Sequence, residues 1–277
     1  MTTDHPYPPL PSISANYRFR LGVPSYVYPA DILPNVEALA PFVDNIEISL
    51  FQSEQLSALP APVTVERLRQ LALDHELIYT IHFPMDRKLG SPQSDERESH
   101  QQQILKIMAL TRPLDPLAYV LHLEGIEPDA HPATVKIWQD TVSEMLPAIV
   151  AQAKHPAQIC IENLLYPFAW CDVFLERFGL GACLDTGHLT RSGGDVHRHF
   201  RQYADRIQEI HLHGVKDGRD HLPLTVLPEA WLDRFLNSID NFTGVLTLEL
   251  FEFAAVRLSM ERLSQCLMKH SHDPNSK

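Results

Sequence analysis

A chain of 277 residues, 44% of them hydrophobic, can bury a sizeable core, which excludes disorder along its whole length. The formal net charge of -12 argues against a surface that holds a nucleic acid backbone, so we expect no nucleic acid partner. No apolar run approaches the length that crosses a bilayer, and no basic start precedes an apolar stretch, so we expect a cytoplasmic protein without membrane contact.

The two ends of the sequence and its four cysteines carry no recognisable catalytic or metal-binding motif. Residues 1–17 are rich in Pro and Ser and lack periodicity, and residues 271–277 are similar, so we expect both to be disordered tails. Residues 18–270 then form one catalytic domain. Because the sequence has no C-x-x-C pair, we expect four buried free thiols, at Cys160, Cys171, Cys183 and Cys266.

Between the tails, short apolar or β-branched runs alternate with longer segments of helical period. The runs predict eight strands, at residues 19–27, 45–51, 77–83, 117–123, 158–163, 181–185, 206–213 and 244–250. A strand followed by a helix, repeated eight times, predicts an α/β fold of the (β/α)8 TIM-barrel type in a single domain. A doubly wound open sheet is the alternative, but the first strand runs into "PSYVYPAD" rather than a glycine-rich phosphate turn.

Seven of the eight predicted strands carry titratable residues near the carboxyl end, where a barrel builds its active site. These residues are Glu47, His82, His122, Glu162, Asp185, His211 with His213, and Glu249. Buried carboxylates need an opposite charge, and imidazoles beside carboxylates are ligands for divalent metal, so the pattern predicts a metal cluster. A single inward histidine is more often a packing residue, and only the convergence of the whole set favours metal.

Two loops at the same end add candidate ligands. In "GACLDTGHLTRSGGD" the strand ends on Asp185 and His188 follows three positions later, and "HLHGVKDGRDHLPL" adds His221. His211 and His213 share a face of the seventh strand, so only one of them needs to bind metal. We favour His213, because it lies nearer the rim.

Charged residues near this rim are candidates for substrate binding. Arg191, Lys216 and Arg219 lie in loops at the same end and could hold an anionic group such as phosphate, although solvated loop charges are equally expected. Glu47 faces the right way to meet a ligand, or it is structural. Motifs of other enzyme classes, such as G-x-x-x-x-G-K-[ST], G-x-S-x-G and H-E-x-x-H, do not occur.

The order of "IEN", "LDTGH", "HLH" and "LEL" along the last four strands resembles the xylose-isomerase-like TIM barrels, which include sugar epimerases and endonuclease IV. The resemblance to the epimerases implies one metal with four ligands: Glu162, Asp185, His213 and Glu249. The resemblance to endonuclease IV implies four further ligands and more metals: His82, His122, His188 and His221. Arg219 stands where the endonuclease pattern has Asp, which leaves a third metal site open, and His211 competes with His213 for the seventh-strand position.

Other stretches are similar to the cobamide-remodelling phosphodiesterases, relatives of endonuclease IV that cut the nucleotide loop of corrinoid cofactors. These stretches are "SYVYPADILPNVEALAPFVDNIEISLFQSE", "HFPMDRKLGS", "TRPLDPLAYVLHLEG" and "HLHGVKDGRDHLPL". The resemblance implies that the substrate is a cobamide, a small molecule, and that the product is cobinamide phosphate.

Four functions are compatible with these residues. A phosphodiesterase would hold two or three divalent ions of zinc, manganese, iron or cobalt, with Glu162 as the bridge. A sugar or sugar-phosphate isomerase would hold one ion and use Glu162 and Glu249 as its acid and base. A corrinoid- or sugar-binding protein without catalysis is disfavoured by the intact ligand set. A DNA endonuclease ranks below the isomerase because of the acidic balance, and the oligomeric state is not readable from the sequence.

Overall fold

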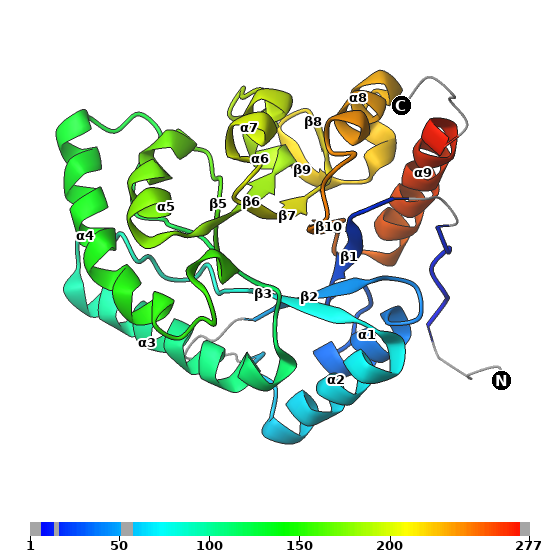
Figure 1. Ribbon diagram of the computed structural model, residues 1–277, viewed down its shortest axis with the longest axis horizontal. Coiled ribbons are helices and arrows are strands. Elements are labelled where there is room, and N and C mark those ends of the chain that lie inside the picture. The colour runs from blue at the N-terminus through cyan, green and yellow to red at the C-terminus, as the bar shows by residue number, and fades with distance from the viewer. Residues whose placement is uncertain (1–6, 14–16, 51–57, 272–277) are drawn as a thin grey trace.

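The computed structural model describes residues 7–13, 17–50 and 58–271, and eight strands in these segments close into one parallel barrel (Figure 1). The strands follow the order β1-β10-β7-β6-β5-β4-β3-β2 around the barrel, and all neighbours are parallel. Their bounds are β1 Arg20–Pro24, β2 Asn45–Ser49, β3 Ile78–His82, β4 Ala118–Leu121, β5 Ile159–Glu162, β6 Gly181–Asp185, β7 Ile207–His211 and β10 Val245–Thr247. Each predicted run contains one of these strands, which confirms the (β/α)8 fold; Phe51, at the end of the second run, lies outside the described residues.

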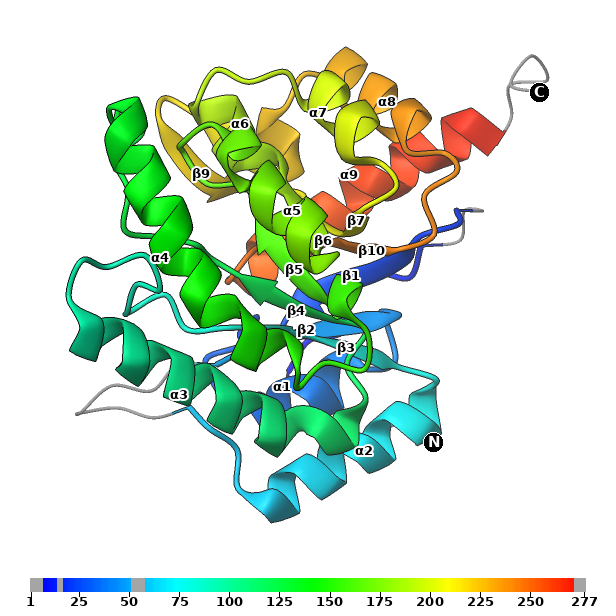
Figure 2. The ribbon, with the colours of Figure 1, turned by 60° about the vertical axis from the view of Figure 1, so that its left-hand side comes forward.

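Helices form a ring outside the strands (Figures 1 and 2). Their bounds are α1 Ile32–Leu39, α2 Pro62–His75, α3 Ser94–Thr111, α4 Pro132–Val150, α5 Asp172–Phe178, α6 Thr186–Arg191, α7 Val196–Tyr203, α8 Glu229–Ser238 and α9 Phe253–Ser271. Proline begins α2 and α4, where its missing N–H is not needed. Asp195 caps α7 by accepting the backbone N–H of Arg198 at 3.0 Å.

A hairpin follows β7. Its strands are β8 Gly214–Lys216 and β9 Arg219–Leu222, and they pair antiparallel. The two residues between them, Asp217 and Gly218, have φ of 53° and 76°. Asp-Gly is a common pair in such two-residue turns, because both positions need positive φ. The strand β7 therefore ends at His211, and His213 lies in the link to the hairpin.

The buried residues form two layers. Outward side chains of the strands, such as Tyr79, Ile81 and Ile161, pack against the helices in one large core. Inside the barrel a separate cluster of small residues lies on neighbouring strands: Ala118, Val120, Cys160 and Cys183. All four cysteines are buried and free, as predicted. The small inner layer leaves room for the larger polar groups at the carboxyl ends of the strands.

Residues 7–13 belong to the segment predicted as a tail, and they contact the barrel. The Tyr28 hydroxyl donates a hydrogen bond to the Pro8 carbonyl at 2.6 Å, and the rings of Tyr7 and Tyr28 stack with centroids 4.6 Å apart. Leu10 is buried. These contacts cover the outside of the loop after β1, so this part of the segment packs on the domain.

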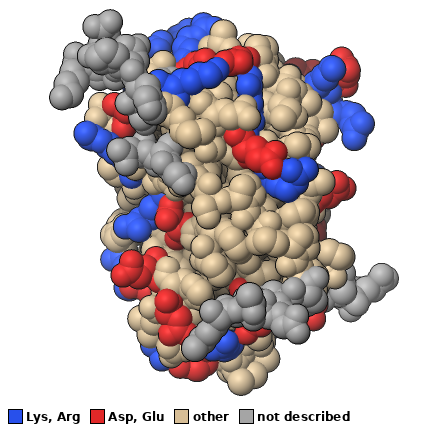
Figure 3. Space-filling view, turned by 90° about the vertical axis from the view of Figure 1, so that its right-hand side faces the viewer, with Lys and Arg blue, Asp and Glu red and all other residues tan. Residues whose placement is uncertain are grey.

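Charges of both signs lie interspersed on the face of the molecule that Figure 3 shows, with uncharged surface between them. The net charge is therefore not gathered into one single-sign patch on that face. Across the described residues, every helix is too short or too polar for a membrane crossing.

We expect that enlarging the inner layer will destabilise the barrel. Ala118→Leu adds three carbons to a space that Val120 and Cys160 already fill, and overpacking of this kind costs about 1–3 kcal/mol. Urea unfolding followed by circular dichroism measures the change. Ala133→Leu on the exposed side of α4 is the matched control and should leave the free energy of unfolding unchanged. Equal stability of the two variants would contradict the inner-layer assignment.

Candidate metal centre at the barrel mouth

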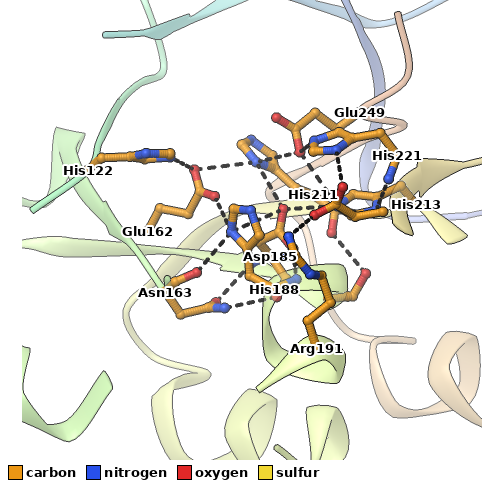
Figure 4. Close-up of polar contacts among 12 residues, drawn as sticks. His122, Glu162, Asn163, Asp185, His188, Arg191, His211, His213, His221 and Glu249 are labelled. Atoms are coloured by element: carbon orange, nitrogen blue, oxygen red, sulfur yellow. Dashed lines mark hydrogen bonds and ion pairs between the residues drawn. The ribbon is translucent and has the colours of Figure 1, made fainter. Parts of the chain in front are cut away.

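The structure brings the nine predicted metal ligands together at the carboxyl ends of the strands (Figure 4). Four are the last residues of strands, namely His82 of β3, Glu162 of β5, Asp185 of β6 and His211 of β7. The others follow a strand or lie on α6 and the hairpin: His122, His188, His213, His221 and Glu249. Because parallel strands of a barrel end at one rim, positions far apart in sequence become neighbours.

Glu162 lies at the centre of this group and is almost fully buried. One of its oxygens, Oε2, is 2.9 Å from Nε2 of His122 and 3.4 Å from Nε2 of His82. The other, Oε1, is 3.0 Å from Nδ1 of His188. The two oxygens thus face different imidazoles, which is the placement of a carboxylate that can bridge two cations.

The ring of His211 faces three carboxylates. Its Nδ1 lies 3.6 Å from Glu162 Oε2, 3.5 Å from Glu249 Oε2 and 3.9 Å from Asp185 Oδ2. These distances are too long for hydrogen bonds, and the buried His211 Nδ1 and Glu249 Oε2 have no hydrogen-bond partner among the described residues. A tetrahedral ion with bonds of about 2.1 Å holds its ligand atoms about 3.4 Å apart. The spacing and the unpaired atoms therefore fit a bound divalent cation.

Hydrogen bonds distinguish His211 from His213. His213 Nδ1 accepts the backbone N–H of His221 at 3.0 Å, so the ring proton lies on Nε2, which donates to Asp185 Oδ2 at 3.1 Å. No lone pair of His213 is then available for metal. His211 instead has Nε2 2.9 Å from Glu47 Oε2 and leaves Nδ1 to the carboxylates. The geometry favours His211 over His213, against the preference that we drew from the rim position.

A second group of residues that faces Glu162 Oε2 fits a second ion. His82 Nδ1 lies 2.9 Å from the Phe83 carbonyl and donates to it, so in the neutral ring Nε2 carries the lone pair that faces Glu162. Ligand atoms of His82, His122 and Glu162 all lie within 4.8 Å of one another. This group and the group around His211 share the Glu162 carboxylate.

A third ion has poorer support from the residues present. His221 Nε2 is 3.3 Å from Glu249 Oε2, and its Nδ1 is 3.3 Å from Asp220 Oδ1. Asp220 is already paired with the Arg191 guanidinium, and Arg219 is exposed on β9. The other carboxylate of the hairpin, Asp217, is exposed at the turn between β8 and β9, so Asp220 is the hairpin carboxylate beside His221, and Arg191 already engages it.

Buried carboxylates and imidazoles shift one another's protonation. Burial alone would raise the pKa of Glu162, but the imidazoles of His122 and His211 hold it well below its usual range. Burial disfavours the charged form of His122, yet the Glu162 carboxylate outweighs this effect and raises its pKa to about 10. In the same way a hydrogen bond to Glu162 outweighs burial and raises the pKa of His188 to about 9. In the metal-free protein, protons on the imidazoles therefore neutralise the charge of the carboxylates.

A cavity of about 660 Å³ opens beside the ligands. Its walls include His122, His188 and Arg191, together with Lys88, a cation that the sequence reading did not single out. Lys88 lies in the stretch after β3, away from any strand end, so the strand-end pattern did not indicate it. Of the other predicted cations, Lys216 is exposed on β8 and Arg219 on β9, and neither lines this cavity.

Two residues near the barrel mouth have roles that the sequence did not reveal. Glu47, a candidate for substrate contact or for a structural role, lies in the middle of β2, is fully buried against His211 and is not among the residues that line the cavity. Asn163 was not singled out. Its side chain donates to the Asp185 carbonyl and accepts the Asp185 N–H, both at 2.9 Å, and so joins β5 to β6 beyond their last paired residues. The sequence feature that points to Asn163 is a polar residue directly after a predicted ligand, as in "IEN".

An eight-stranded parallel barrel with acids and imidazoles buried at its carboxyl end is the architecture of metal-dependent TIM-barrel enzymes. The chain belongs to the xylose isomerase-like TIM barrel family, whose sequence model matches residues 41–266. No curated protein sequence matches the chain.

Solved structures that include an epimerase-like protein and an endonuclease are similar to this chain in fold. A D-tagatose 3-epimerase-like protein superposes with a TM-score of 0.75 at 20% identity, covering 91% of this chain and 98% of its own. Endonuclease IV from Thermus thermophilus superposes with a TM-score of 0.69 at 18% identity, covering 90% of this chain and 99% of its own. At these identities the comparison establishes the fold and leaves the reaction to the site.

We expect metal affinity to rise with pH. His122 and His188 have pKa values of about 10 and about 9, so both are protonated at pH 7 in the metal-free protein, and a cation must displace those protons. Affinity should therefore increase from pH 6 towards pH 9, with net proton release on binding. Calorimetric titration with Zn²⁺ in buffers of different ionisation enthalpy measures the released protons; a pH-independent affinity would contradict the assignment.

Removing the shared carboxylate should affect both ion positions. Glu162→Gln replaces an oxygen of the bridge with an amide NH2, which cannot bind a cation, so metal per chain should fall by at least one ion relative to the wild type. Elemental analysis of the desalted protein gives the number. Glu176→Gln on the exposed side of α5 removes the same charge far from the mouth and should keep the wild-type metal content. A full metal complement in Glu162→Gln would rule out the bridging position.

Proposed function

We propose that the chain is a metal-dependent phosphodiesterase that hydrolyses the nucleotide loop of cobamides and releases cobinamide phosphate. One observation carries the proposal: Oε2 of Glu162 faces two groups of ligand atoms, one containing His82 and His122 and the other centred on His211. Paired cations suit in-line displacement at a phosphodiester, whereas an isomerase needs only one. The choice of a cobamide as the substrate rests on the sequence resemblance to the cobamide-remodelling phosphodiesterases.

The roles of the residues follow from their contacts. Glu162 would bridge two ions, with His82 and His122 on one side and His211, Asp185 and Glu249 on the other. Bound zinc, manganese, iron or cobalt would supply an activated water and neutralise charge on the phosphodiester oxygens.

Protein groups keep these ligands and the substrate in place. His213 donates Nε2–H to Asp185 and so fixes the direction of that carboxylate. Arg191, held by Asp220 in the cavity wall, presents a guanidinium to an incoming phosphate oxygen.

The charges of the cavity argue against a nucleic acid strand as the substrate. Two cations, Lys88 and Arg191, face three acids, Glu96, Glu124 and Glu127, across the cavity walls. A nucleic acid backbone binds along a continuous basic tract, because each of its phosphates carries a charge. A single phosphodiester held by Lys88 or Arg191 needs no such tract.

A sugar or sugar-phosphate isomerase that uses one metal is the second candidate. His211 Nδ1 and the three carboxylates that face it form a complete one-ion site by themselves. Glu162 and Glu249 would then act as acid and base on a sugar between them. This candidate gives no metal role to His82 and His122, although both lie next to Glu162.

The product distinguishes the candidates. We expect protein loaded with Zn²⁺, Mn²⁺, Fe²⁺ or Co²⁺ to convert an intact cobamide into cobinamide phosphate, detected by liquid chromatography and mass spectrometry. Removal of metal by a chelator should abolish the reaction, and the added cation should restore it. Elemental analysis should give two ions per chain.

Other outcomes would overturn this proposal. Epimerised ketohexose with one ion per chain would establish the isomerase. Cleavage of DNA containing an abasic site would establish an endonuclease. Tight binding of a cobamide by the metal-loaded protein without any turnover would identify a binding protein.

A further inference from the structure

Glu47 and His211 form a buried pair directly below the metal centre. Glu47 lies on β2 and His211 ends β7, far apart along the chain, and both are fully buried. Glu47 Oε2 and His211 Nε2 are 2.9 Å apart, the distance of a good hydrogen bond. The pair lies outside the cavity walls, so Glu47 acts on the site only through the imidazole.

The two nitrogens of His211 have separate surroundings. Nδ1 faces the carboxylates of Glu162, Asp185 and Glu249 at 3.5 to 3.9 Å, and Nε2 faces Glu47. An imidazole that binds a cation keeps one N–H, and the acceptor of that N–H decides which nitrogen carries the free lone pair. With Glu47 as the acceptor, the lone pair lies on Nδ1 and points at the other carboxylates.

A second buried acid lies close by but does not accept this hydrogen bond. Glu209 Oε1 is 3.9 Å from His211 Nε2, beyond hydrogen-bond distance. The same oxygen already accepts the hydroxyls of Thr80 at 3.0 Å and Thr247 at 2.7 Å. Glu47 is therefore the acceptor for the ring N–H, and Glu209 belongs to the polar floor beneath it.

We propose that Glu47 is a positioning residue for the metal centre: it fixes the tautomer and the orientation of His211 and makes Nδ1 a stronger ligand. A carboxylate that accepts the second N–H of a metal-bound histidine increases the basicity of the ring and holds its plane. The inference rests on the metal-binding part of the proposed function and is independent of the substrate.

Two matched substitutions test the pairing. Glu47→Gln and Glu209→Gln each replace one buried carboxylate with an amide of the same shape near the same imidazole. Glu47→Gln should weaken Zn²⁺ binding about 10- to 100-fold, the loss typical of an outer partner of a metal-bound histidine, whereas Glu209→Gln should bind Zn²⁺ like the wild type. Competition with a chromophoric chelator measures the affinity, and the visible absorption of bound Co²⁺ should change only in Glu47→Gln.

A measurement on the wild type keeps the test decisive if Glu47→Gln does not fold. In zinc-loaded protein labelled with ¹⁵N-histidine, His211 should show a zinc-bound Nδ1 and a protonated Nε2. A protonated Nδ1, or unchanged zinc affinity in folded Glu47→Gln, would overturn the inference, and so would an equal loss in Glu209→Gln. Failure to hydrolyse cobamides, with the Glu47→Gln effect on zinc intact, would overturn the phosphodiesterase alone.

Discussion

Several carboxylates share the interior of one barrel, and the need to neutralise them governs the rest of the structure. Glu47, Glu162, Asp185, Glu209 and Glu249 are all buried. Each buried carboxylate costs several kcal/mol unless an opposite charge or a proton lies beside it. The imidazoles at the barrel mouth provide that charge for four of them. Glu209 lies deeper, and burial together with the Glu47 carboxylate raises its pKa to about 8, so it holds its own proton at neutral pH.

In this arrangement the strand ends and the loops beyond them carry side chains with different roles. Strand ends, which the barrel holds rigidly, carry His82, Glu162, Asp185 and His211 of the candidate metal centre, while the inner layer below them consists of small residues. Helix α6 and the β8–β9 hairpin carry the adjustable part, where Arg191 and Asp220 pair at the cavity wall. Ligand geometry and substrate contacts can therefore vary independently, as expected for a fold that supports many reactions by loop variation.

The barrel and the ligand set could be predicted from the sequence because both depend on simple periodicity. Strand runs whose side chains alternate in direction, with a polar residue at each carboxyl end, were sufficient to place Glu162, Asp185 and Glu249 at one rim. The direction of a side-chain hydrogen bond, by contrast, has no periodic pattern in the sequence from which it could be predicted. The choice of His211 over His213 depends on where β7 ends and on the backbone N–H of His221, which the hairpin folds back onto His213.

The role of Glu47 was beyond sequence reasoning for a similar reason. An inward residue of a strand can face the open mouth of the barrel or the polar floor below it. The two positions differ only in depth along the barrel axis. The hairpin, by contrast, had a sequence signal in its Asp217-Gly218 pair, which favours a two-residue turn. Asn163 was adjacent to a ligand, yet its task of joining two strands is visible only when β5 and β6 lie side by side.

Closure of the ring brings the beginning and the end of the chain together. The last strand, β10, pairs with β1 on one side and β7 on the other, and Glu249 lies two residues beyond it. A cation held by Glu162 and Glu249 would link the end of β5 to the segment after β10, and any ligand that binds only the folded state stabilises it by mass action. Scarcity of metal would then lower the stability of the closed barrel.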